Sequence, residues 1–273
     1  MLNMFMRNKK FFFMKKRQSI LSVIERRRKY FRHLQSLRQP VQFKNNYNSI
    51  IPLVIYQTWH SKDRIPNLMQ KSINKLRMSN PRFNYQLFDD NDCREFIKNN
   101  FDEDVLNAFD TLIPGAYKAD LWRYCILYKM GGIYLDIKYS CCNNFRLIHL
   151  TESEHFCADL GDNGIYNAIL VALPGNEILY NAIRKIVENV NTRYYGNGCL
   201  DPTGPMLLAQ FINVNNSIVD LKHLLLQNDF NQRAISFQGK TILKSYSGYI
   251  VESKFFAKVP HYARLWSERK IYK

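Results

Sequence analysis

The sequence contains no long apolar run and no targeting segment. Phe11 to Met14 form the only apolar cluster near its start, and a secretory signal needs an apolar region of about 7 residues or more. The cluster falls further below the ~20 apolar residues that span a bilayer. We therefore expect no signal peptide and no transmembrane helix, and we expect a cytoplasmic protein.

Cysteine is scarce, with six residues in a chain of 273. No two cysteines stand as Cys-x-x-Cys, and the adjacent Cys141 and Cys142 have no paired histidines nearby. Disulfide scaffolds and structural zinc sites both need denser cysteine patterns than this one. The sequence therefore predicts reduced thiols.

Acidic residues are almost absent from the first 44 positions, which hold 13 Lys or Arg against the single acid Glu25. This segment contributes +12 of the formal net charge of +16, so the remaining residues carry only +4. With 46% apolar residues, the chain fits one sizeable globular domain. We expect a basic amphipathic extension over residues 1–44 and a folded domain over residues 45–273.

The basic extension has helical periodicity, with apolar residues near one face and arginines elsewhere. Such a helix suits peripheral contact with an anionic membrane surface, a partner groove or nucleic acid. It would equally pack on the main domain with a solvated cationic face. A basic nucleic-acid-binding protein is the rival from another functional class, but confinement of the charge to the extension argues against it.

The chain is organised around residues 116–142, AYKADLWRYCILYKMGGIYLDIKYSCC. Asp120 and Arg123 have helical spacing and share one face, and the Gly-Gly pair ends the helix. The following IYLDI is a β-prone run, so Asp136 is expected near the end of a buried strand. Ligands bind outside the carboxyl ends of strands in open α/β sheets, which makes Asp136 a candidate ligand group. The plainer alternatives are a solvated salt bridge for Asp120 with Arg123 and a turn cap for Asp136.

The segment ADLWRYCILYKMGGIYLD closely resembles the signature of the DXD-containing, sugar-binding glycosyltransferases, the family of the yeast initiating α-1,6-mannosyltransferase and the sphingolipid mannosyltransferases. More distantly, it resembles the glucosyltransferase domain of the large clostridial toxins. In the family, the helix Asp and Arg hold the donor sugar and its phosphates, which implies these roles for Asp120 and Arg123. The family strand ends in Asp-x-Asp, which binds a divalent metal on the nucleotide diphosphate. Asp136 matches the first acid, and Lys138 replaces the second.

Two earlier segments also resemble family elements near the nucleoside. The apolar run from Ile50 to Tyr56 is expected to form the first strand and leads into Trp59, whose ring would stack on a base or pack in the core or at its rim. The segment NPRFNYQLFDD is expected to contain a second strand over Asn84 to Phe88, with Asp89 at its acidic end. One of the next two residues, Asp90 or Asn91, would cap the following helix.

Two later segments complete the resemblance. A Thr-Gly-Pro element contains Gly204, which allows close backbone approach, and a closing element contains His261 and Trp266. Between them, residues 249–257 have a strand-like composition. The resemblance implies a GT-A type α/β fold over residues 45–273, with a mostly parallel central sheet flanked by helices.

A departing diphosphate needs positive charge, which Mn²⁺ or Mg²⁺ held by carboxylate oxygen supplies. The resemblance implies Asp136 as a ligand. With Lys138 in place of the second acid, three interpretations stay open. His261 or water completes the metal shell, the Lys138 ammonium acts directly on the phosphate, or activity has been lost.

The family resemblance implies that the protein is a retaining glycosyltransferase. The resemblance implies a UDP- or GDP-hexose of the mannose, galactose or glucose type as donor, and a glycan, lipid or protein as acceptor. The donor-binding residues predicted around the catalytic Asp120, Arg123 and Asp136 are Trp59, Asp89, Lys138, Gly204 and Trp266. The alternatives are a catalytically impaired nucleotide-sugar or glycan binder and a basic nucleic-acid-binding protein.

Overall fold

The computed structural model describes residues 43–159, 164–212, 225–228, 233–237 and 239–273. The basic extension predicted over residues 1–44 lies outside the described residues, except for its last two positions. Within the described ranges, none of the helices has the length and apolar character required to cross a bilayer.

A nine-stranded sheet runs through the described part of the chain, in the order β2-β1-β3-β6-β5-β7-β8-β9-β4. The strands are β1 (Val54–Thr58), β2 (Asn84–Phe88), β3 (Gly132–Leu135), β4 (Tyr139–Cys141), β5 (His155–Ala158), β6 (Ile165–Ala172), β7 (Leu225–Asn228), β8 (Ala234–Phe237) and β9 (Lys240–Ser245).

Parallel pairing is concentrated where the candidate site lies. β1 pairs in parallel with both β2 and β3, and β5 pairs in parallel with β7. The other ladders are antiparallel. Three of them, β5–β6, β7–β8 and β8–β9, join strands that follow one another in the chain, and a short connection cannot join parallel neighbours. The other two, β3–β6 and β4–β9, pair strands that are far apart in the sequence. The predicted α/β class is confirmed, with the parallel part of the sheet formed by β2, β1 and β3.

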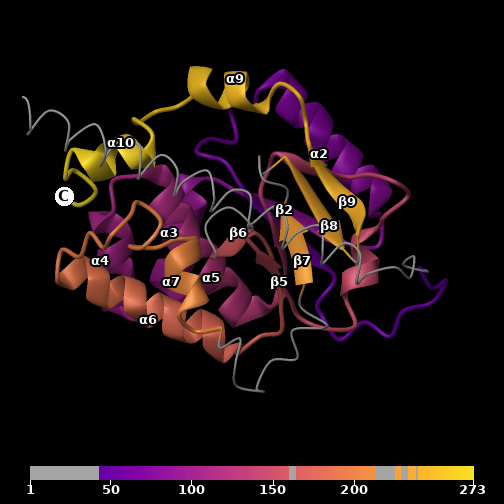
Figure 1. Cartoon of the computed structure of the whole chain (residues 1–273), viewed down its shortest axis with the longest axis horizontal. Coiled ribbons are helices and arrows are strands. Elements are labelled where there is room, and N and C mark those ends of the chain that lie inside the picture. The colour runs from indigo at the N-terminus through magenta and orange to yellow at the C-terminus, as the bar shows by residue number, and fades with distance from the viewer. Residues whose placement is uncertain (1–42, 160–163, 213–224, 229–232, 238) are drawn as a thin grey trace, which may run out of the picture.

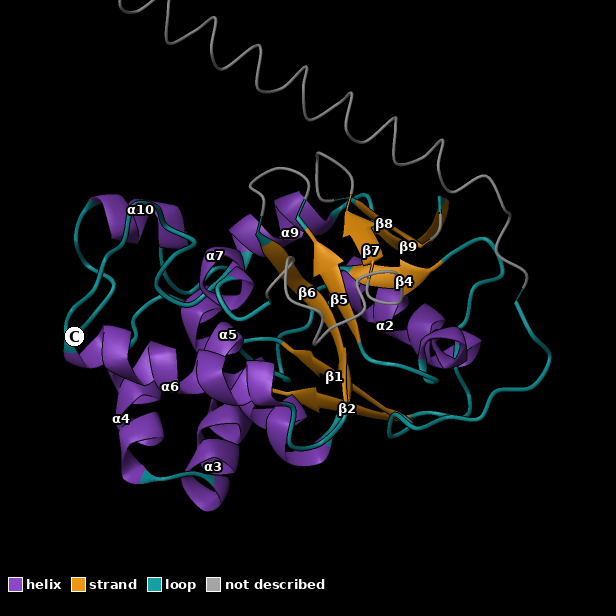
Figure 2. Cartoon of the chain, turned by 60° about the horizontal axis from the view of Figure 1, so that its bottom comes forward, coloured by secondary structure: helices purple, strands orange, loops and turns teal. Residues whose placement is uncertain are grey.

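Helices cover both faces of the sheet (Figures 1 and 2). They are α2 (Asn67–Ser79), α3 (Asp90–Asn100), α4 (Glu103–Thr111), α5 (Gly115–Met130), the short 3₁₀ helix η1 (Leu147–Leu150), α6 (Glu177–Asn191), α7 (Pro205–Ala209), α9 (Tyr249–Phe255) and α10 (Tyr262–Ser267). The helices α3 to α7 pack together on one side, and α2 packs on the other.

Side chains alternate along the central strands and so supply two apolar cores. Tyr56 and Tyr134 belong to the core beneath α5, whereas the adjacent Ile55 and Ile133 belong to the core on the opposite face. The central strands are therefore buried on both faces, which explains their nearly continuous apolar sequences.

α5 is the central helix, and nine of its residues are buried. It ends at Gly131, whose φ of 63° lies in the left-handed region. A Cβ atom at Gly131 would lie 2.6 Å from Cδ of Pro174. The glycine therefore allows the chain to turn directly from α5 into β3, as the Gly-Gly pair predicted.

One predicted strand is wrong. Residues 249–255 form α9, although their composition favours a strand. Glu252 accepts hydrogen bonds from the backbone N–H of Leu68 and from the hydroxyl of Tyr246, so tertiary contacts hold this segment as a helix turn. Strand propensity is weak enough for such contacts to override it.

Candidate active site

α5 turns two charged side chains into the protein interior. Asp120 is 7% exposed and Arg123 is 6% exposed, and the Arg123 Nη2 lies 3.5 Å from the Asp120 Oδ1. A solvated salt bridge, the plainer alternative for this pair, is therefore wrong. Burying an ion pair costs desolvation free energy unless further hydrogen bonds satisfy both charges, so Asp120 and Arg123 need additional partners.

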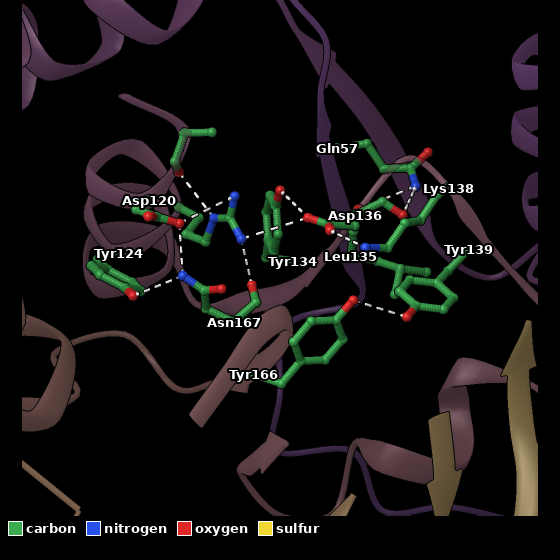
Figure 3. A network of polar contacts seen from close by, with 12 residues as sticks. Gln57, Asp120, Tyr124, Tyr134, Leu135, Asp136, Lys138, Tyr139, Tyr166 and Asn167 are labelled. Atoms are coloured by element: carbon green, nitrogen blue, oxygen red, sulfur yellow. Dashed lines mark hydrogen bonds and ion pairs between the residues drawn. The ribbon is translucent and has the colours of Figure 1, made fainter. Parts of the chain in front are cut away.

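Asp120 is held by donors from two distant segments (Figure 3). The Asn167 Nδ2 in β6 donates to Oδ1 at 2.6 Å, and the Thr203 Oγ1 before α7 donates to Oδ2 at 2.8 Å. Burial raises the pKa of the Asp120 carboxyl to about 6, while Arg123, Thr203 and Asn167 oppose this rise. Asp120 is therefore mostly ionised at neutral pH, and it takes up a proton when the pH falls by about one unit.

Arg123 joins the helix to the sheet. Its Nη1 donates to the backbone carbonyl of Asn167 at 2.6 Å and lies 3.5 Å from the Asp136 Oδ1. The guanidinium carbon stands 4.3 Å from the centroid of the Tyr134 ring. Planar stacking and a fixed fork of donors suit arginine to this position, and lysine would not reproduce them. Arg123 thereby places Asp120 and Asp136 on either side of one cation.

Asp136 follows β3 directly, at the carboxyl end of the parallel part of the sheet. Its Oδ1 accepts a hydrogen bond from the Tyr134 hydroxyl at 2.9 Å, and its backbone N–H donates to the Ala168 carbonyl at 2.7 Å. The chain then turns, with the Tyr139 N–H donating to the Asp136 carbonyl at 3.0 Å. Asp136 therefore opens this turn, as the plainer alternative held, and its carboxylate also enters the polar network.

The turn brings Lys138 back over Asp136. The Lys138 Nζ lies 3.3 Å from the Asp136 Oδ2, and the side chain is 13% exposed. Its ammonium also faces three aromatic rings, at 5.2 Å from Tyr139, 5.3 Å from Tyr166 and 5.7 Å from Tyr249, measured to the ring centroids. Figure 3 shows the side chain turned toward Asp136, so Lys138 belongs to the site.

The comparisons with known proteins match the part of the chain that carries this network. Residues 66–156 match the family model described as the glycosyltransferase sugar-binding region containing DXD motif. The predicted family resemblance is confirmed. Members of this glycosyltransferase family generally use a nucleotide sugar and a divalent metal. The matched residues include α5, β3 and the turn that carries Asp136 and Lys138.

Individual relatives are similar over the same part of the chain. Inositol phosphoceramide mannosyltransferase 3 of Schizosaccharomyces pombe is 31% identical over 169 residues, which are 60% of this chain and 46% of the relative. The initiation-specific alpha-1,6-mannosyltransferase of the same yeast is 25% identical over 57% of this chain and 44% of the relative. An uncharacterized glycosyltransferase of Acanthamoeba polyphaga mimivirus is 36% identical over 35% of this chain and 38% of the relative. The chain thus spans less than half the length of these curated relatives.

Among solved structures, the PaToxG glycosyltransferase aligns with a TM-score of 0.44 and 16% identity, over 71% of this chain and 78% of that chain. The ligand-free glycosyltransferase domain from the YGT toxin aligns with the same TM-score and 9% identity, over 71% of this chain and 82% of that chain.

A divalent cation does not fit the side chains around Asp136. Hard cations such as Mg²⁺ and Mn²⁺ bind several oxygen ligands, whereas the Asp136 carboxylate already faces the two cations Arg123 and Lys138. Within the described ranges, no group of three or more His, Cys, Asp or Glu side chains is placed to hold a metal ion. His261 caps α10 instead, since its Nδ1 accepts from the Ala263 N–H at 3.3 Å. The predicted pair of Asp136 and His261 therefore lacks the surrounding donors that a metal shell needs.

The structure places Trp59 and Asp89 at the ends of β1 and β2. Trp59 donates from Nε1 to the Arg64 carbonyl at 3.1 Å and packs against the cluster that contains Ile137. Asp89 accepts from the N–H groups of both residues 91 and 92 and forms a capping box with Asp92. We predicted the cap of this helix at Asp90 or Asn91, and the structure places it one residue earlier, at Asp89. Trp59 lies beside the turn of the site, and donor binding by either residue stays a prediction.

Gly204 lies beside the carboxylate network, whereas Trp266 packs elsewhere. A Cβ atom at Gly204 would lie 3.5 Å from the Asp120 Oδ2. The Thr-Gly-Pro element therefore contributes the Thr203 hydroxyl and a close backbone approach at one place. Trp266 donates from Nε1 to the Tyr195 carbonyl at 2.6 Å and packs against the core beneath α5.

Sequence reasoning did not single out Asn167, Thr203 or the tyrosines around Lys138. Asn167 had a usable signal, because it is the one amide in the otherwise apolar strand IYNAILVA. A polar residue buried among apolar ones needs a hydrogen-bond partner, and here the partners are Asp120 and Tyr124. The tyrosines had no such signal, since tyrosine is common throughout the chain.

Proposed function

We propose that this chain is a retaining glycosyltransferase. It would move a hexose of the mannose, galactose or glucose type from a UDP- or GDP-sugar to a hydroxyl group of a glycan, lipid or protein acceptor. The observation that carries this proposal is the network in which the buried Asp120 and Arg123 of α5 meet Asp136 at the carboxyl end of β3, inside the matched sugar-binding region. The names of the yeast relatives, which include an inositol phosphoceramide mannosyltransferase, support a hexose donor and a lipid or glycan acceptor.

The proposed reaction exchanges one bond at C1 of the hexose for another. The bond from C1 to the β-phosphate oxygen breaks, and the oxygen keeps the electron pair as the nucleoside diphosphate departs. The acceptor hydroxyl oxygen bonds to C1 on the same face, and its proton passes to the departing phosphate. Negative charge grows on that phosphate while positive charge grows on the sugar ring. Cations and carboxylates fixed on opposite sides of C1 would stabilise both.

Asp120 suits recognition of a sugar hydroxyl. Asn167 and Arg123 face its Oδ1, whereas among the described residues only Thr203 donates to Oδ2. A carboxylate oxygen has two lone pairs, so Oδ2 keeps acceptor capacity for a hydroxyl of the donor. The fixed orientation matters for catalysis, because a pre-positioned acceptor aligns C1 without further ordering.

A screen for donor hydrolysis tests the proposal without knowledge of the acceptor, because water can replace it. The purified full chain is incubated with UDP- and GDP-hexoses, and released UDP or GDP is measured. We expect release from one donor, and a fall of about a hundredfold in Asp136→Asn. Asp104→Asn is the matched control, because this side chain on α4 is 65% exposed, and its activity should stay at the wild-type level.

Two results would contradict this function. One is that no nucleotide hexose is bound or hydrolysed by the folded wild-type chain. The other is that Asp136→Asn retains wild-type release. Binding without release would instead support the impaired nucleotide-sugar binder.

A further inference from the structure

Lys138 occupies the position at which the family motif has its second acid, and its ammonium is fixed there by the fold. The turn places Asp136 and Lys138 two residues apart on a hydrogen-bonded loop, with Nζ 3.3 Å from the Asp136 Oδ2. The Tyr246 N–H donates to the Lys138 carbonyl at 3.1 Å and so ties the turn to the end of β9. Both ends of the lysine are therefore held.

Three tyrosine rings surround the Lys138 ammonium. Rings of Tyr139, Tyr166 and Tyr249 lie within 5.7 Å of the Lys138 Nζ, a distance at which ring faces attract cations. A 3.0 Å hydrogen bond between the Tyr139 and Tyr166 hydroxyls fixes two of these rings. The positive charge is therefore in place before any ligand arrives, which lowers the ordering cost of binding an anion.

The charges of the network balance without a metal ion. Asp120 and Asp136 supply two negative charges, and Arg123 and Lys138 supply two positive ones. A divalent cation at Asp136 would lie beside both cations and would have to displace the lysine from its carboxylate. A diphosphate oxygen could instead accept from the ammonium where it stands, because the ammonium has three N–H donors and Asp136 does not use them all.

We propose that Lys138 replaces the divalent metal ion in this chain, so that its ammonium binds the donor diphosphate directly and donor binding is independent of Mn²⁺ and Mg²⁺. This inference rests on the proposed function. It narrows the three interpretations of the sequence to one, in which the lysine is a phosphate ligand. An ammonium is a point charge without the coordination geometry of a metal, and lysine binds phosphate in this way elsewhere.

Calorimetric titration of the full chain tests this independence directly. The ligands are the UDP- and GDP-hexoses and the free nucleoside diphosphates, each in EDTA and in Mn²⁺. We expect the wild type to bind its donor with the same Kd, within about twofold, in both buffers. Lys138→Met keeps the length of the side chain but removes the charge, and should weaken binding by about tenfold to a hundredfold in both. Lys244→Met, an exposed lysine on β9, is the matched control and should bind like the wild type.

Lys138→Asp adds a result that a merely structural lysine would not give. It restores the second acid of the motif, so its donor binding should be weak in EDTA and recover in Mn²⁺. That recovery also shows that the variant is folded. If Lys138→Met does not fold, the comparison of the wild type in EDTA and Mn²⁺ decides alone.

The inference and the proposed function fail differently. Wild-type binding that requires Mn²⁺ would overturn metal independence and leave the glycosyltransferase intact. Equal binding by Lys138→Met and the wild type in EDTA would likewise overturn it. Failure of every nucleotide sugar to bind in either buffer would overturn both.

Discussion

Replacing Thr203 by valine removes one hydroxyl from a closed carboxylate site and changes the side-chain shape very little. Thr203 is 1% exposed, and its Oγ1 donates to the Asp120 Oδ2 at 2.8 Å. In the variant, a methyl group faces this oxygen, while Asn167 and Arg123 still hold the other. The ionised form of Asp120 loses a donor that the neutral form needs less, so we expect its pKa to rise.

The size of the rise follows from the hydrogen bond. A hydrogen bond to a charged group contributes about 1.5–3 kcal/mol, and one pKa unit corresponds to about 1.4 kcal/mol. The pKa of Asp120, about 6 in the wild type because of burial, should therefore rise by about one to two units.

The sign of the stability change follows from proton linkage. The folded state binds the Asp120 proton more tightly than the unfolded state. The free energy of unfolding therefore falls as the pH rises from the ordinary aspartate pKa of 3.8 through the folded-state pKa of about 6. In Thr203→Val the folded-state pKa of Asp120 is higher, so the free energy of unfolding continues to fall up to a higher pH. The variant should therefore be less stable than the wild type by about 1.5–3 kcal/mol near pH 8, and by less near pH 5.

Two measurements check this prediction. Urea unfolding at pH 5 and pH 8 gives the difference in the free energy of unfolding between the variant and the wild type. In the pH profile of kcat/KM for donor hydrolysis, the acidic limb of the variant should lie at higher pH than that of the wild type. Thr203→Ser keeps the hydroxyl and should keep the wild-type limb. An unmoved limb, together with an equal stability loss at both pH values, would refute the reasoning, because Thr203 would then hold α7 without acting on Asp120.

Two further predictions concern stability and domain limits. Gly131→Ala should lower the free energy of unfolding by about 1–2 kcal/mol or more, because the φ of Gly131 is 63° and the added Cβ would contact Pro174. Gly175→Ala is the control, since Gly175 has a φ of 78° but no atom within 4 Å of an added Cβ. In the same urea titration, Gly175→Ala should lower the free energy of unfolding by less. A chain starting at residue 43 should keep donor hydrolysis and thermal stability. Removal of residues 43 and 44 as well should lower Tm, because the Phe43 ring stacks 4.1 Å from His149, and equal Tm values would show that this contact contributes nothing.

Local signals in the sequence determined the elements that need only their own residues. The position of β2 follows from a short strand-forming run between a proline turn and an acidic cap, and the sequence predicted a strand in this segment. The junction of α5 and β3 follows from Gly131, whose left-handed conformation other residues adopt only at a cost. For the same reason, the sequence placed Asp136 at a strand end.

Only the tertiary structure decided how the site is closed. Asn167 lies 47 residues from Asp120, and Thr203 lies 83 residues from it, so no local pattern predicts that both hold one carboxylate. Sequence periodicity also left open whether Asp120 and Arg123 face solvent or the interior, because α5 is apolar on several sides. Burial against β6 settled this, since charges removed from water must be paired.

Lys138, which replaces the second acid of the family motif, also shows which properties come from the sequence and which from the tertiary structure. The sequence alone determined that the second acid of the motif is a lysine, but a residue in a turn can point toward the site or away from it. Its direction depends on the rings of Tyr166 in β6 and Tyr249 in α9, which approach the turn only when the sheet is assembled. Residue identity is a property of the chain, whereas the electrostatic environment of that residue comes from segments that folding brings together.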